Sequence, residues 1–443
     1  MSDAMPIPVD RLETRLADAK PVYADGEAVA EAHRCLYCHD APCVQACPTG
    51  IDIPVFIRKI ATGNVRGSAR AILSANLLGY SCARVCPVEV LCVGACVYND
   101  WHRYPAIQIG RLQRYAVEKT FAGGRAATLL TRAPANGRKV ACVGGGPASL
   151  AAAGYLALAG IAVTVFERRT VAGGLNTTGV APYKMHVEGA MAEVEFIRSL
   201  GVTIRTRVEV GRDLDPAVLL RDYDAVFLGV GLGPDARLGV AGEEGPGVVG
   251  ATQWIERLKL EPGFALAGVG RALVVGGGNT AIDAARELAR LGVGDVAMAY
   301  RRTAADMSGY AHEMDLARKE GVRLIERAVP REFVRDGGGK LVALRLVDGR
   351  ELPAELVVVG IGQARLRDLV ARFPGVSMDD KGLVVVEPGS GRTGNPKVFA
   401  GGDALGGELV VTAVQEGKRA ARGICDAFGV AVPPDSPIRA GHA

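Results

Sequence analysis

The feature that most constrains this chain is a concentration of cysteine near its start. Eight of its ten cysteines fall between positions 35 and 96, in two blocks that each contain a Cys-Pro pair. The blocks consist of Cys35, Cys38, Cys43 and Cys47, spaced by two, four and three residues, and of Cys82, Cys86, Cys92 and Cys96. Thiolates grouped in this way can hold compact iron–sulfur clusters, which exchange one electron at a time. We therefore expect two [4Fe–4S] clusters in this region.

The sequence supports other roles for these cysteines less well than cluster binding. Disulfides need an oxidising compartment, but the first residues show no basic stretch followed by an apolar core, so we expect a cytoplasmic protein with reduced thiols. Zinc is a more serious alternative, because the Cys-x2-Cys spacing of the first block is equally typical of a zinc site. The Cys-Pro pairs and the nucleotide-binding units described below favour clusters. Cys142 and Cys425 lie outside the blocks and are expected to be small core residues.

The composition is that of a globular α/β protein. The 443 residues include 58 glycines and only 5% aromatic residues, which favours many tight turns between strands and helices. A net charge of +4 without a long basic block gives no reason to expect binding to nucleic acid or to a membrane surface. The apolar stretch from Ala148 to Phe166 is long enough to cross a bilayer, but it follows a glycine-rich turn and ends at Glu167. A helix followed by a buried strand is expected there instead.

Residues 1–135 are expected to form an all-helical domain that binds the clusters, followed by a linker. No run up to about residue 120 alternates as a strand would. Asp52 and Pro54 mark the start of one helix, and residues 66–75 are expected to form another. Gly123, Gly124 and residues 133–137 are typical of a linker.

From Lys139 the pattern changes to strand, glycine-rich turn, helix and strand, and this unit occurs twice. The first copy comprises residues 140–143, 144–149, a helix to about 159, and 162–166; the second comprises 272–275, 276–281, a helix through 291, and 296–300. Each turn resembles Gly-x-Gly-x-x-Gly, with Ser149 or Ala281 as a small third residue that still allows close packing of helix on strand. We therefore expect two Rossmann-like dinucleotide-binding domains in tandem.

The residue after the second strand of each unit indicates which nucleotide is bound. Glu167 stands there in the first unit and can accept a bond from a ribose hydroxyl of FAD. Arg301 and Arg302 stand there in the second unit and suit the 2′-phosphate of NADPH. An ordinary solvated strand end is the alternative for this arginine pair, and no basic residue follows between Thr303 and Gly309. The second unit is therefore expected to bind NADPH or NADH.

Two later motifs are also expected to bind FAD. Gly174 and Leu175 follow the first unit, and Gly402 and Asp403 end a late strand, where a carboxylate can accept a bond from the ribityl chain. The FAD domain is thus expected to be discontinuous, with the NAD(P)H domain inserted in it. The expected parts are residues 136–265 and 376–443 for FAD and residues 266–375 for NAD(P)H.

The residues expected to bind nucleotides come from these motifs. For FAD they are Gly144, Gly146, Pro147, Ser149, Glu167, Gly174, Leu175, Gly402, Asp403 and Thr412. For NAD(P)H they are Gly276, Gly278, Asn279, Thr280, Arg301, Arg302, Gly360 and Gly362. No residue is assigned the role of catalytic acid, base or nucleophile.

Together these motifs resemble a known family: the flavin-containing subunit of bacterial dihydropyrimidine dehydrogenase, equivalent to the N-terminal half of the eukaryotic enzyme. The small subunit of glutamate synthase is a more distant relative. The resemblance runs from about Glu31 to Gly429. Its most specific motifs are residues 34–43, 78–87, 109–115 and 276–283.

The resemblance implies a set of cluster ligands that spacing alone does not give. Cys35, Cys38, Cys43 and Cys96 would hold one cluster, and Cys47, Cys86, Cys92 and the amide oxygen of Gln113 the other. The residues by themselves favour eight cysteines for two clusters, so Cys82 and Gln113 stay alternatives for the last ligand. Gln113 favours the pyrimidine enzyme, since the glutamate synthase relatives have Glu there. The resemblance also places Lys184 near the flavin, where the eukaryotic relative has an arginine.

The function implied by the resemblance is that of an electron-input subunit. NAD(P)H would pass hydride to FAD, and single electrons would leave through the clusters. The chain has neither a barrel-like repeat of strands nor spare length for a second flavin site. We therefore expect a hetero-oligomer with an FMN-containing partner subunit that reduces uracil or thymine to the 5,6-dihydropyrimidine.

Three other functions were weighed against this one. A glutamate synthase-type enzyme would keep the cofactors and change the partner to a glutamate-forming large subunit. A disulfide reductase needs a redox-active cysteine pair near the flavin, but there is no cysteine between residues 143 and 424. A cluster-bearing sensor or assembly scaffold would use the nucleotide folds only as structure. Reduction of a dye by NAD(P)H would exclude the scaffold.

Overall fold

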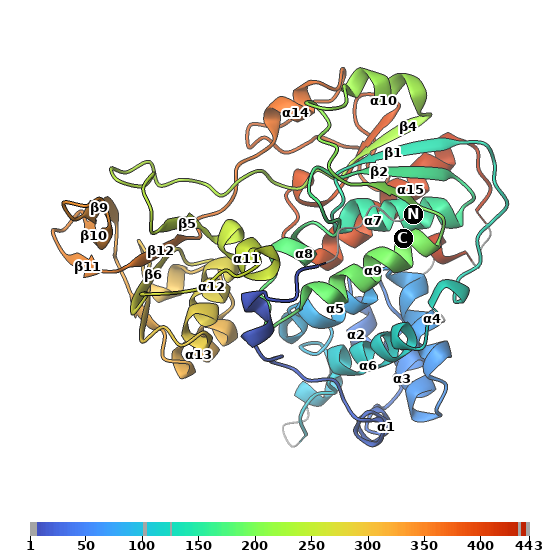
Figure 1. The fold of residues 1–443 in the computed structure, drawn as a ribbon. Coiled ribbons are helices and arrows are strands. Elements are labelled where there is room, and N and C mark those ends of the chain that lie inside the picture. The colour runs from blue at the N-terminus through green and yellow to red at the C-terminus, as the bar shows by residue number, and fades with distance from the viewer. Residues whose placement is uncertain (1–6, 101–103, 125, 433–435, 440–443) are drawn as a thin grey trace.

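The computed structural model describes residues 7–100, 104–124, 126–432 and 436–439, and it divides the chain into three parts. In Figure 1 a helical domain, coloured blue, lies below a five-stranded sheet with helices around it. A second five-stranded sheet lies to one side, and a small three-stranded sheet forms its far end. The fold is therefore α/β with an all-helical N-terminal domain, as the sequence predicts.

Short helices in the N-terminal domain carry and connect the cysteine blocks. They are α1 (Asp25–His33), α2 (Pro42–Gln45), α3 (Ile53–Ala61), α4 (Val65–Ala75), α5 (Gly79–Val85) and α6 (Ile109–Ala122). Asp52 caps α3 as expected, accepting a hydrogen bond from the N–H of Val55 at 3.1 Å. Helix α4 begins one residue earlier than predicted, because Asn64 caps it by accepting from the N–H of Gly67 at 2.8 Å. No strand occurs before Lys139 in the described residues.

The first nucleotide domain is built on a parallel sheet with the strand order β13-β4-β1-β2-β3. Its strands are β1 (Lys139–Val143), β2 (Ala162–Phe166), β3 (Thr203–Arg205), β4 (Ala225–Leu228) and β13 (Val398–Ala400). Its helices are α7 (Pro147–Leu158), α8 (Leu175–Thr178), α9 (Val187–Ser199), α10 (Pro216–Asp222), α14 (Arg367–Ala371) and α15 (Val410–Ala427). The apolar stretch from Ala148 to Phe166 is thus α7 and β2. In the part of the chain that the structure describes, no helix is long and apolar enough to span a membrane.

The second nucleotide domain has a parallel sheet of order β5-β12-β6-β7-β8. Its strands are β5 (Val248–Gly250), β6 (Arg271–Val275), β7 (Asp295–Ala299), β8 (Arg323–Ile325) and β12 (Leu356–Val359). Helices α11 (Ala251–Leu260), α12 (Asn279–Arg290) and α13 (Ala311–Lys319) pack on one face through residues such as Val274. The antiparallel strands β9 (Pro330–Arg335), β10 (Leu341–Leu346) and β11 (Glu351–Pro353) belong to the small sheet, which packs on the other face through Leu273 and Val275. Burial on both faces explains why these strands are continuously apolar.

The insertion occurs as expected, but both crossings lie earlier than predicted. Strand β5 pairs with β12, so the chain enters the second sheet between β4 and β5 and not near residue 265. It returns before α14, because Val370 and Phe373 lie in the core of the first domain, so the second crossing also precedes residue 375. Strand β5 has only three residues, which is too short to stand out as a periodic pattern.

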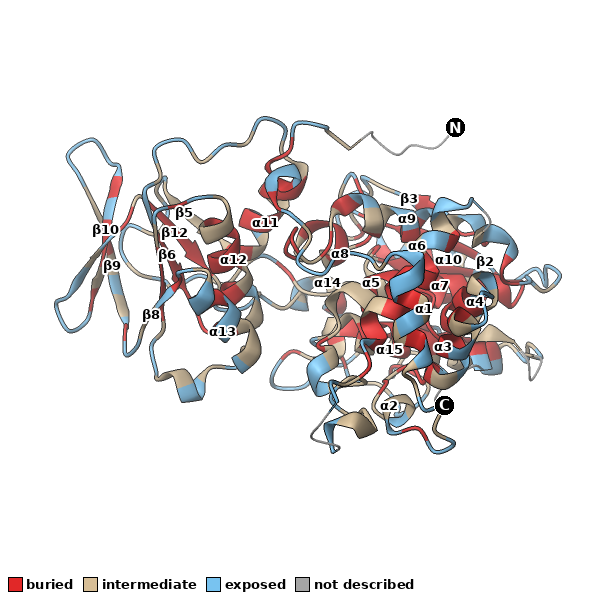
Figure 2. Ribbon diagram, turned by 90° about the horizontal axis from the view of Figure 1, so that it is seen from below, coloured by how far each residue is buried: buried red, intermediate tan, exposed pale blue. Residues whose placement is uncertain are grey.

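The N-terminal and first nucleotide domains share one core. Residues of α3, α4 and α6 form a continuous buried cluster with residues of α7, α9 and α15, and Figure 2 shows α7 as almost entirely buried. Cys142 and Cys425 lie in this cluster and are fully buried, as predicted. Because the two domains share a core, they are expected to move as one body.

Residues 12–16 do not pack in the helical domain to which the sequence assigned them. The 3₁₀ turn Leu12–Arg15 places Leu12 in the core of the second nucleotide domain, beside Trp254 of α11. Leu16, four residues on, packs against Tyr183 of the first nucleotide domain. The segment therefore ties the two nucleotide domains together.

Candidate functional site

A cleft of about 820 Å³ runs between the three domains, which is a size typical of cofactor sites. Of the residues predicted to bind nucleotides, its walls include Gly144, Gly146, Pro147, Glu167, Gly174, Leu175, Lys184, Asn279, Thr280, Gly402 and Asp403. The predicted residues that do not line it are Ser149, Gly276, Gly278, Arg301, Arg302, Gly360, Gly362 and Thr412. The structure thus brings residues from both glycine-rich turns and from the late motif to one site.

The first glycine-rich turn joins β1 to α7 and closes onto Glu167. Gly144 has a φ of +90°, and a side chain there would lie 2.6 Å from the carbonyl oxygen of Gly229, so only glycine fits. Glu167 is buried directly after β2, and it accepts hydrogen bonds from the N–H groups of Gly145 at 2.7 Å and Arg169 at 2.8 Å. These two bonds fix the carboxylate at the strand end where a ribose is bound in this type of fold.

The start of α7 is suited to a negatively charged group. No side chain caps the helix, so its first N–H groups and the positive end of its dipole face the cleft at Pro147. The buried atom Oδ1 of Asn176, a residue of the cleft wall, has no hydrogen-bond partner within the described structure, and neither has Oγ of Ser149 behind the wall. A side chain on Gly174 would lie 2.7 Å from the Cα of Gly146, so bare backbone lines this part. A bare cradle with unsatisfied polar atoms fits the phosphates and sugar of FAD.

The late motif contributes a carboxyl group. Gly402 has a φ of +77°, and its N–H donates to Oε2 of Glu416 at 2.5 Å. Burial raises the pKa of Asp403 to about 6, against the effect of Arg365, so this carboxyl group can accept or donate a hydrogen bond near neutral pH. Thr412 lies in the first turn of α15, outside the cleft wall.

The second glycine-rich turn follows β6 and touches the end of β12. Gly276 has a φ of +147°, and a side chain there would collide with the carbonyl oxygen of Gly360. The ring of Tyr300 occupies the space beside Gly277 in which a side chain would otherwise stand. Asn279 accepts a hydrogen bond from the N–H of Tyr310 at 2.9 Å, which holds the loop after β7 over the turn. This turn and loop form the expected place for the NAD(P)H pyrophosphate.

The arginine pair lies outside the cleft wall. Arg301 and Arg302 follow β7 after Tyr300 and are exposed, so they are accessible to a 2′-phosphate but are not arranged around one. Gly278 is the N-cap of α12, and Gly362 follows β12 with a φ of +110°. The preference for NADPH over NADH stays a prediction.

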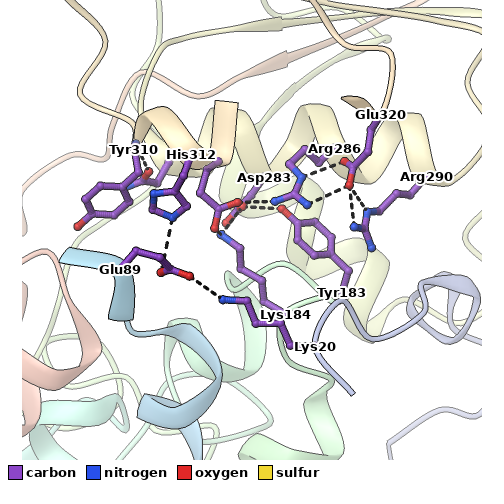
Figure 3. A network of polar contacts seen from close by, with 12 residues as sticks. Lys20, Glu89, Tyr183, Lys184, Asp283, Arg286, Arg290, Tyr310, His312 and Glu320 are labelled. Carbon is purple, nitrogen blue, oxygen red and sulfur yellow. Dashed lines mark hydrogen bonds and ion pairs between the residues drawn. The ribbon is translucent and has the colours of Figure 1, made fainter. Parts of the chain in front are cut away.

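Lys184 forms a polar link between the two nucleotide domains (Figure 3). Its Nζ lies 2.7 Å from Oδ1 of Asp283 on α12 and 2.9 Å from Oε1 of Glu313 on α13. The hydroxyl of Tyr183 also donates to Oδ1 of Asp283, at 2.7 Å. Burial alone would lower the pKa of Lys184, but the two carboxylates raise it, so this buried lysine stays charged.

The link extends along α12. Arg286 pairs with Glu313 and, at 2.9 Å, with Glu320, and its guanidinium stands 4.6 Å from the centre of the Tyr183 ring. On α13, beside Glu313, Nε2 of His312 lies 3.7 Å from Oε2 of Glu89 of the helical domain. All three domains therefore contribute to one network beside the cleft.

The first group of thiols surrounds a small cavity of about 30 Å³. Its members are Cys35, Cys38, Cys43 and Cys96. Burial, followed by the proximity of the other three thiols of the group, raises the pKa of Cys43 to about 12. Four sulfurs in such surroundings would be thiolates at neutral pH only if they bound cations, so they fit an iron–sulfur cluster.

The second group contains Cys47, Cys82, Cys86 and Cys92. A bond from Cys82 raises the pKa of Cys86, followed by burial and by the proximity of Cys92 and Cys47. Cys86 also lines the nucleotide cleft together with Pro87. No three or more Cys, His, Asp or Glu side chains among the described residues are gathered for a single metal ion. Cluster ligands do not need to be, because they bind separate irons of a larger core.

Gln113 and Cys82 both lie at α5, the helix that ends at Cys86. Gln113 is buried on α6, and its Nε2 donates to the carbonyl oxygen of Gly79 at the start of α5, at 2.7 Å. This bond leaves the amide oxygen as the atom of Gln113 that could bind iron. Cys82 lies one turn further along α5, against Cys86. Position alone does not separate the two candidates.

Comparison with known proteins gives a consistent result. Residues 12–124 match the family model described as dihydropyrimidine dehydrogenase domain II, 4Fe-4S cluster, and residues 138–417 match that of pyridine nucleotide-disulphide oxidoreductases. The small chain of NADPH glutamate synthase from Escherichia coli K12 is 34% identical, over 91% of this chain and 92% of its own. The PreT subunit of the NAD-dependent dihydropyrimidine dehydrogenase of the same organism is 33% identical, over 92% of this chain and 96% of its own.

Among solved structures, thioredoxin reductase of T. acidophilum shares the fold of the nucleotide domains. Its TM-score is 0.54 at 23% identity, and the match covers 66% of this chain and 99% of that chain. A two-nucleotide cleft beside two groups of thiols defines the class of flavin and iron–sulfur oxidoreductases. The chain belongs to the pyridine nucleotide-disulphide oxidoreductase family, and its N-terminal domain is of the 4Fe-4S type. It is an NAD(P)H-dependent oxidoreductase with FAD and [4Fe–4S] clusters as cofactors.

Two buried charged residues that no motif singled out support the site. Lys259 of α11 is fully buried and donates to the carbonyl oxygens of Asn176, Val180 and Met185 at 3.3, 3.0 and 2.8 Å, which holds the segment around α8. Glu193 of α9 accepts from the first N–H groups of α5. The only feature of the sequence that could have indicated Lys259 and Glu193 is a charged residue on an otherwise apolar helix face.

Proposed function

We propose that this chain is the electron-input subunit of an NAD(P)-dependent dihydropyrimidine dehydrogenase. It would oxidise NAD(P)H and supply electrons to a partner subunit that carries FMN and reduces uracil or thymine to the 5,6-dihydropyrimidine. The observation that supports electron output is the position of Cys86, which lines the nucleotide cleft and also belongs to the second thiol group. When bound, the flavin accepts electrons in pairs and the clusters pass them on singly.

The chain's own residues would position the nucleotide beside the thiol groups and provide a surface from which electrons can leave. Glu167 and the start of α7 would hold the nucleotide in the cleft whose wall includes Cys86. The pKa of Cys92 is raised by burial and then by Cys47 and Cys43, so the two thiol groups are neighbours. The first group is only partly buried, and Leu36 beside it is exposed. This surface is the expected contact with the partner subunit.

The choice of partner rests on Gln113. Its amide is anchored at 2.7 Å to the carbonyl oxygen of Gly79, and the resemblance to the pyrimidine enzyme implies that its oxygen is a cluster ligand. A glutamate synthase-type partner is the second candidate, because the glutamate synthase small chain is as similar to this chain, at 34% identity, as the PreT subunit at 33%.

Paired reconstitution tests this proposal. The anaerobic holoprotein is assayed with NAD(P)H and a dye, and then with the FMN subunit of a bacterial dihydropyrimidine dehydrogenase or with a glutamate synthase large subunit. We expect dye reduction by the chain alone and dihydrouracil only with the first partner. Cys86→Ser should reduce transfer to the partner more than reduction of the flavin. Glutamate formation with the second partner, without dihydrouracil from the first, would contradict the pyrimidine function.

A further inference from the structure

A chain of buried hydrogen bonds leads from the backbone of α5 to the sulfur of Cys47. The N–H of Leu78 donates to Oδ1 of Asn76 at 2.9 Å, and Nδ2 of Asn76 lies 3.4 Å from Oγ1 of Thr49. Oγ1 of Thr49 in turn lies 3.4 Å from Sγ of Cys47. Asn76 and Thr49 are completely buried, and Cys47 is 9% exposed. Water therefore has little access to any bond in this chain.

The direction of every bond in the chain follows from its first member. A backbone N–H can only donate, so the atom of Asn76 that faces Leu78 is its oxygen, and its NH₂ group faces Thr49. The Thr49 oxygen accepts from that NH₂ group, which leaves its own proton for the sulfur. A thiolate has no proton to give, so a metal-bound Cys47 can only accept. The Leu78 N–H at one end and the metal-bound sulfur at the other therefore require the same bond direction, in which the hydroxyl of Thr49 donates to Cys47.

We propose that Thr49 is a positioning residue for electron transfer, which raises the reduction potential of the cluster bound by Cys47 through its hydrogen bond to that sulfur. The cluster becomes more negative on reduction, and a donor on a ligand sulfur stabilises the reduced form. Asn76 takes part by holding the hydroxyl in the donating orientation. The inference rests on Cys47 as a cluster ligand and does not depend on which partner receives the electrons.

The bond between Thr49 and Cys47 is important because the cluster held by Cys47 would lie beside the nucleotide cleft. The group to which Cys47 belongs includes Cys86 on the wall of the nucleotide cleft, so its cluster would be the first to receive electrons from that side. A higher potential there favours the uptake of an electron from the flavin and disfavours its return. Thr49 also closes the turn after Cys47-Pro48, where the N–H of Gly50 donates to the carbonyl oxygen of Cys47 at 2.9 Å. The hydroxyl is thereby held by the backbone on one side and by Asn76 on the other.

The test is a redox titration of the holoprotein followed by electron paramagnetic resonance. Thr49→Val removes the hydroxyl at nearly constant shape, and Thr49→Ser is the matched control that keeps it. We expect Thr49→Val to lower the equilibrium constant for one-electron reduction of that cluster about tenfold, which is about 59 mV. Thr49→Ser should retain most of the native potential, and both variants should keep the native iron content.

A second variant tests the direction of the chain. Asn76→Asp offers an oxygen to Thr49 in place of an NH₂ group, so the hydroxyl proton turns away from the sulfur, and the added charge lowers the potential as well. In the double variant Thr49→Val/Asn76→Asp, the reduction potential should then fall by less than the sum of the two single changes. Both single changes remove the same hydrogen bond from the Thr49 hydroxyl to Cys47, and it can be lost only once.

The remaining outcomes would overturn the proposal. An unchanged potential in Thr49→Val, an equal loss in Thr49→Ser, or additive changes in the double variant would show that the hydroxyl does not tune the cluster. Loss of the cluster from Thr49→Val would show that the hydroxyl is needed for assembly. Cys47→Ser checks the ligand assignment separately: native iron content in that variant would remove Cys47 from the cluster, whatever Thr49 does.

Discussion

Lys184 of the first nucleotide domain and Asp283 of the second form an ion pair across the cleft, with 2.7 Å between Nζ and Oδ1. Glu313 lies 2.9 Å from the same nitrogen, so one cation holds two carboxylates that would otherwise repel each other. Both carboxylates come from helices of the domain expected to bind NAD(P)H. Lys184 therefore contributes to the relative position of the two nucleotide sites.

Replacement of Lys184 tests this dependence. Lys184→Met should leave the carboxylate of Asp283 without its cation, whereas Glu313 keeps Arg286, and should lower the free energy of unfolding by about 3 kcal/mol. Thermal unfolding of the holoprotein measures the change, with Lys184→Arg as the control that keeps the charge. Asp283→Asn in the Lys184→Met background should recover part of the loss. Equal stability of the Met and Arg variants would contradict an electrostatic link.

The two candidates for the last cluster ligand can be separated by iron and sulfide analysis. Gln113→Ala should lose one cluster, because an oxygen ligand is removed, whereas Cys82→Ser should keep both. The positions form a matched pair, since each lies close to α5 and the second thiol group. Loss of a cluster with Cys82→Ser alone would show that the second site is held by four cysteines.

The arginine pair should control nucleotide preference. In the double variant Arg301→Ala/Arg302→Ala, kcat/KM for NADPH should fall more than tenfold relative to NADH, because each charge-assisted bond to a phosphate contributes about 2 kcal/mol. Arg323→Ala is a suitable control, since Arg323 is an exposed arginine at the start of the neighbouring strand β8, where it pairs with Asp295 at 2.6 Å. An unchanged ratio in the double variant would make the pair an ordinary solvated strand end.

Glu193 should make the stability of the chain depend on pH. Burial raises its pKa to about 7, although the N–H groups of Tyr80 and Ser81 and the Ser81 hydroxyl oppose the shift. Its pKa is higher in the folded chain than in the unfolded chain, so its contribution is complete below about pH 4.5 and is lost as the pH rises through 7. The change amounts to about 3 kcal/mol.

Melting temperatures measured from about pH 4.5 to 8 check this expectation. The wild type should lose stability across the range relative to Glu193→Gln, which cannot ionise. Parallel curves for the two proteins would mean that Glu193 does not titrate in this range.

Features encoded locally could be predicted from the sequence. The strand, turn and helix around Gly144 and around Gly276 follow from short-range periodicity and from turns that only glycine can form. The link between Lys184 and Asp283 could not be predicted, because it joins residues about one hundred positions apart and depends on how two domains are oriented. Lys259 was missed for the same reason: its partners are carbonyl oxygens of another domain, which carry no signal in the sequence.

The position of Leu12 has a consequence for biosynthesis. This residue is synthesised before the pocket that receives it, which is formed by Trp254, Ile282 and other residues of α11 and α12. The segment around Leu12 must therefore stay unanchored until α11 and α12 have been translated. Its docking would be one of the last steps of maturation, and a protease added during synthesis would find it cleavable until the pocket closes.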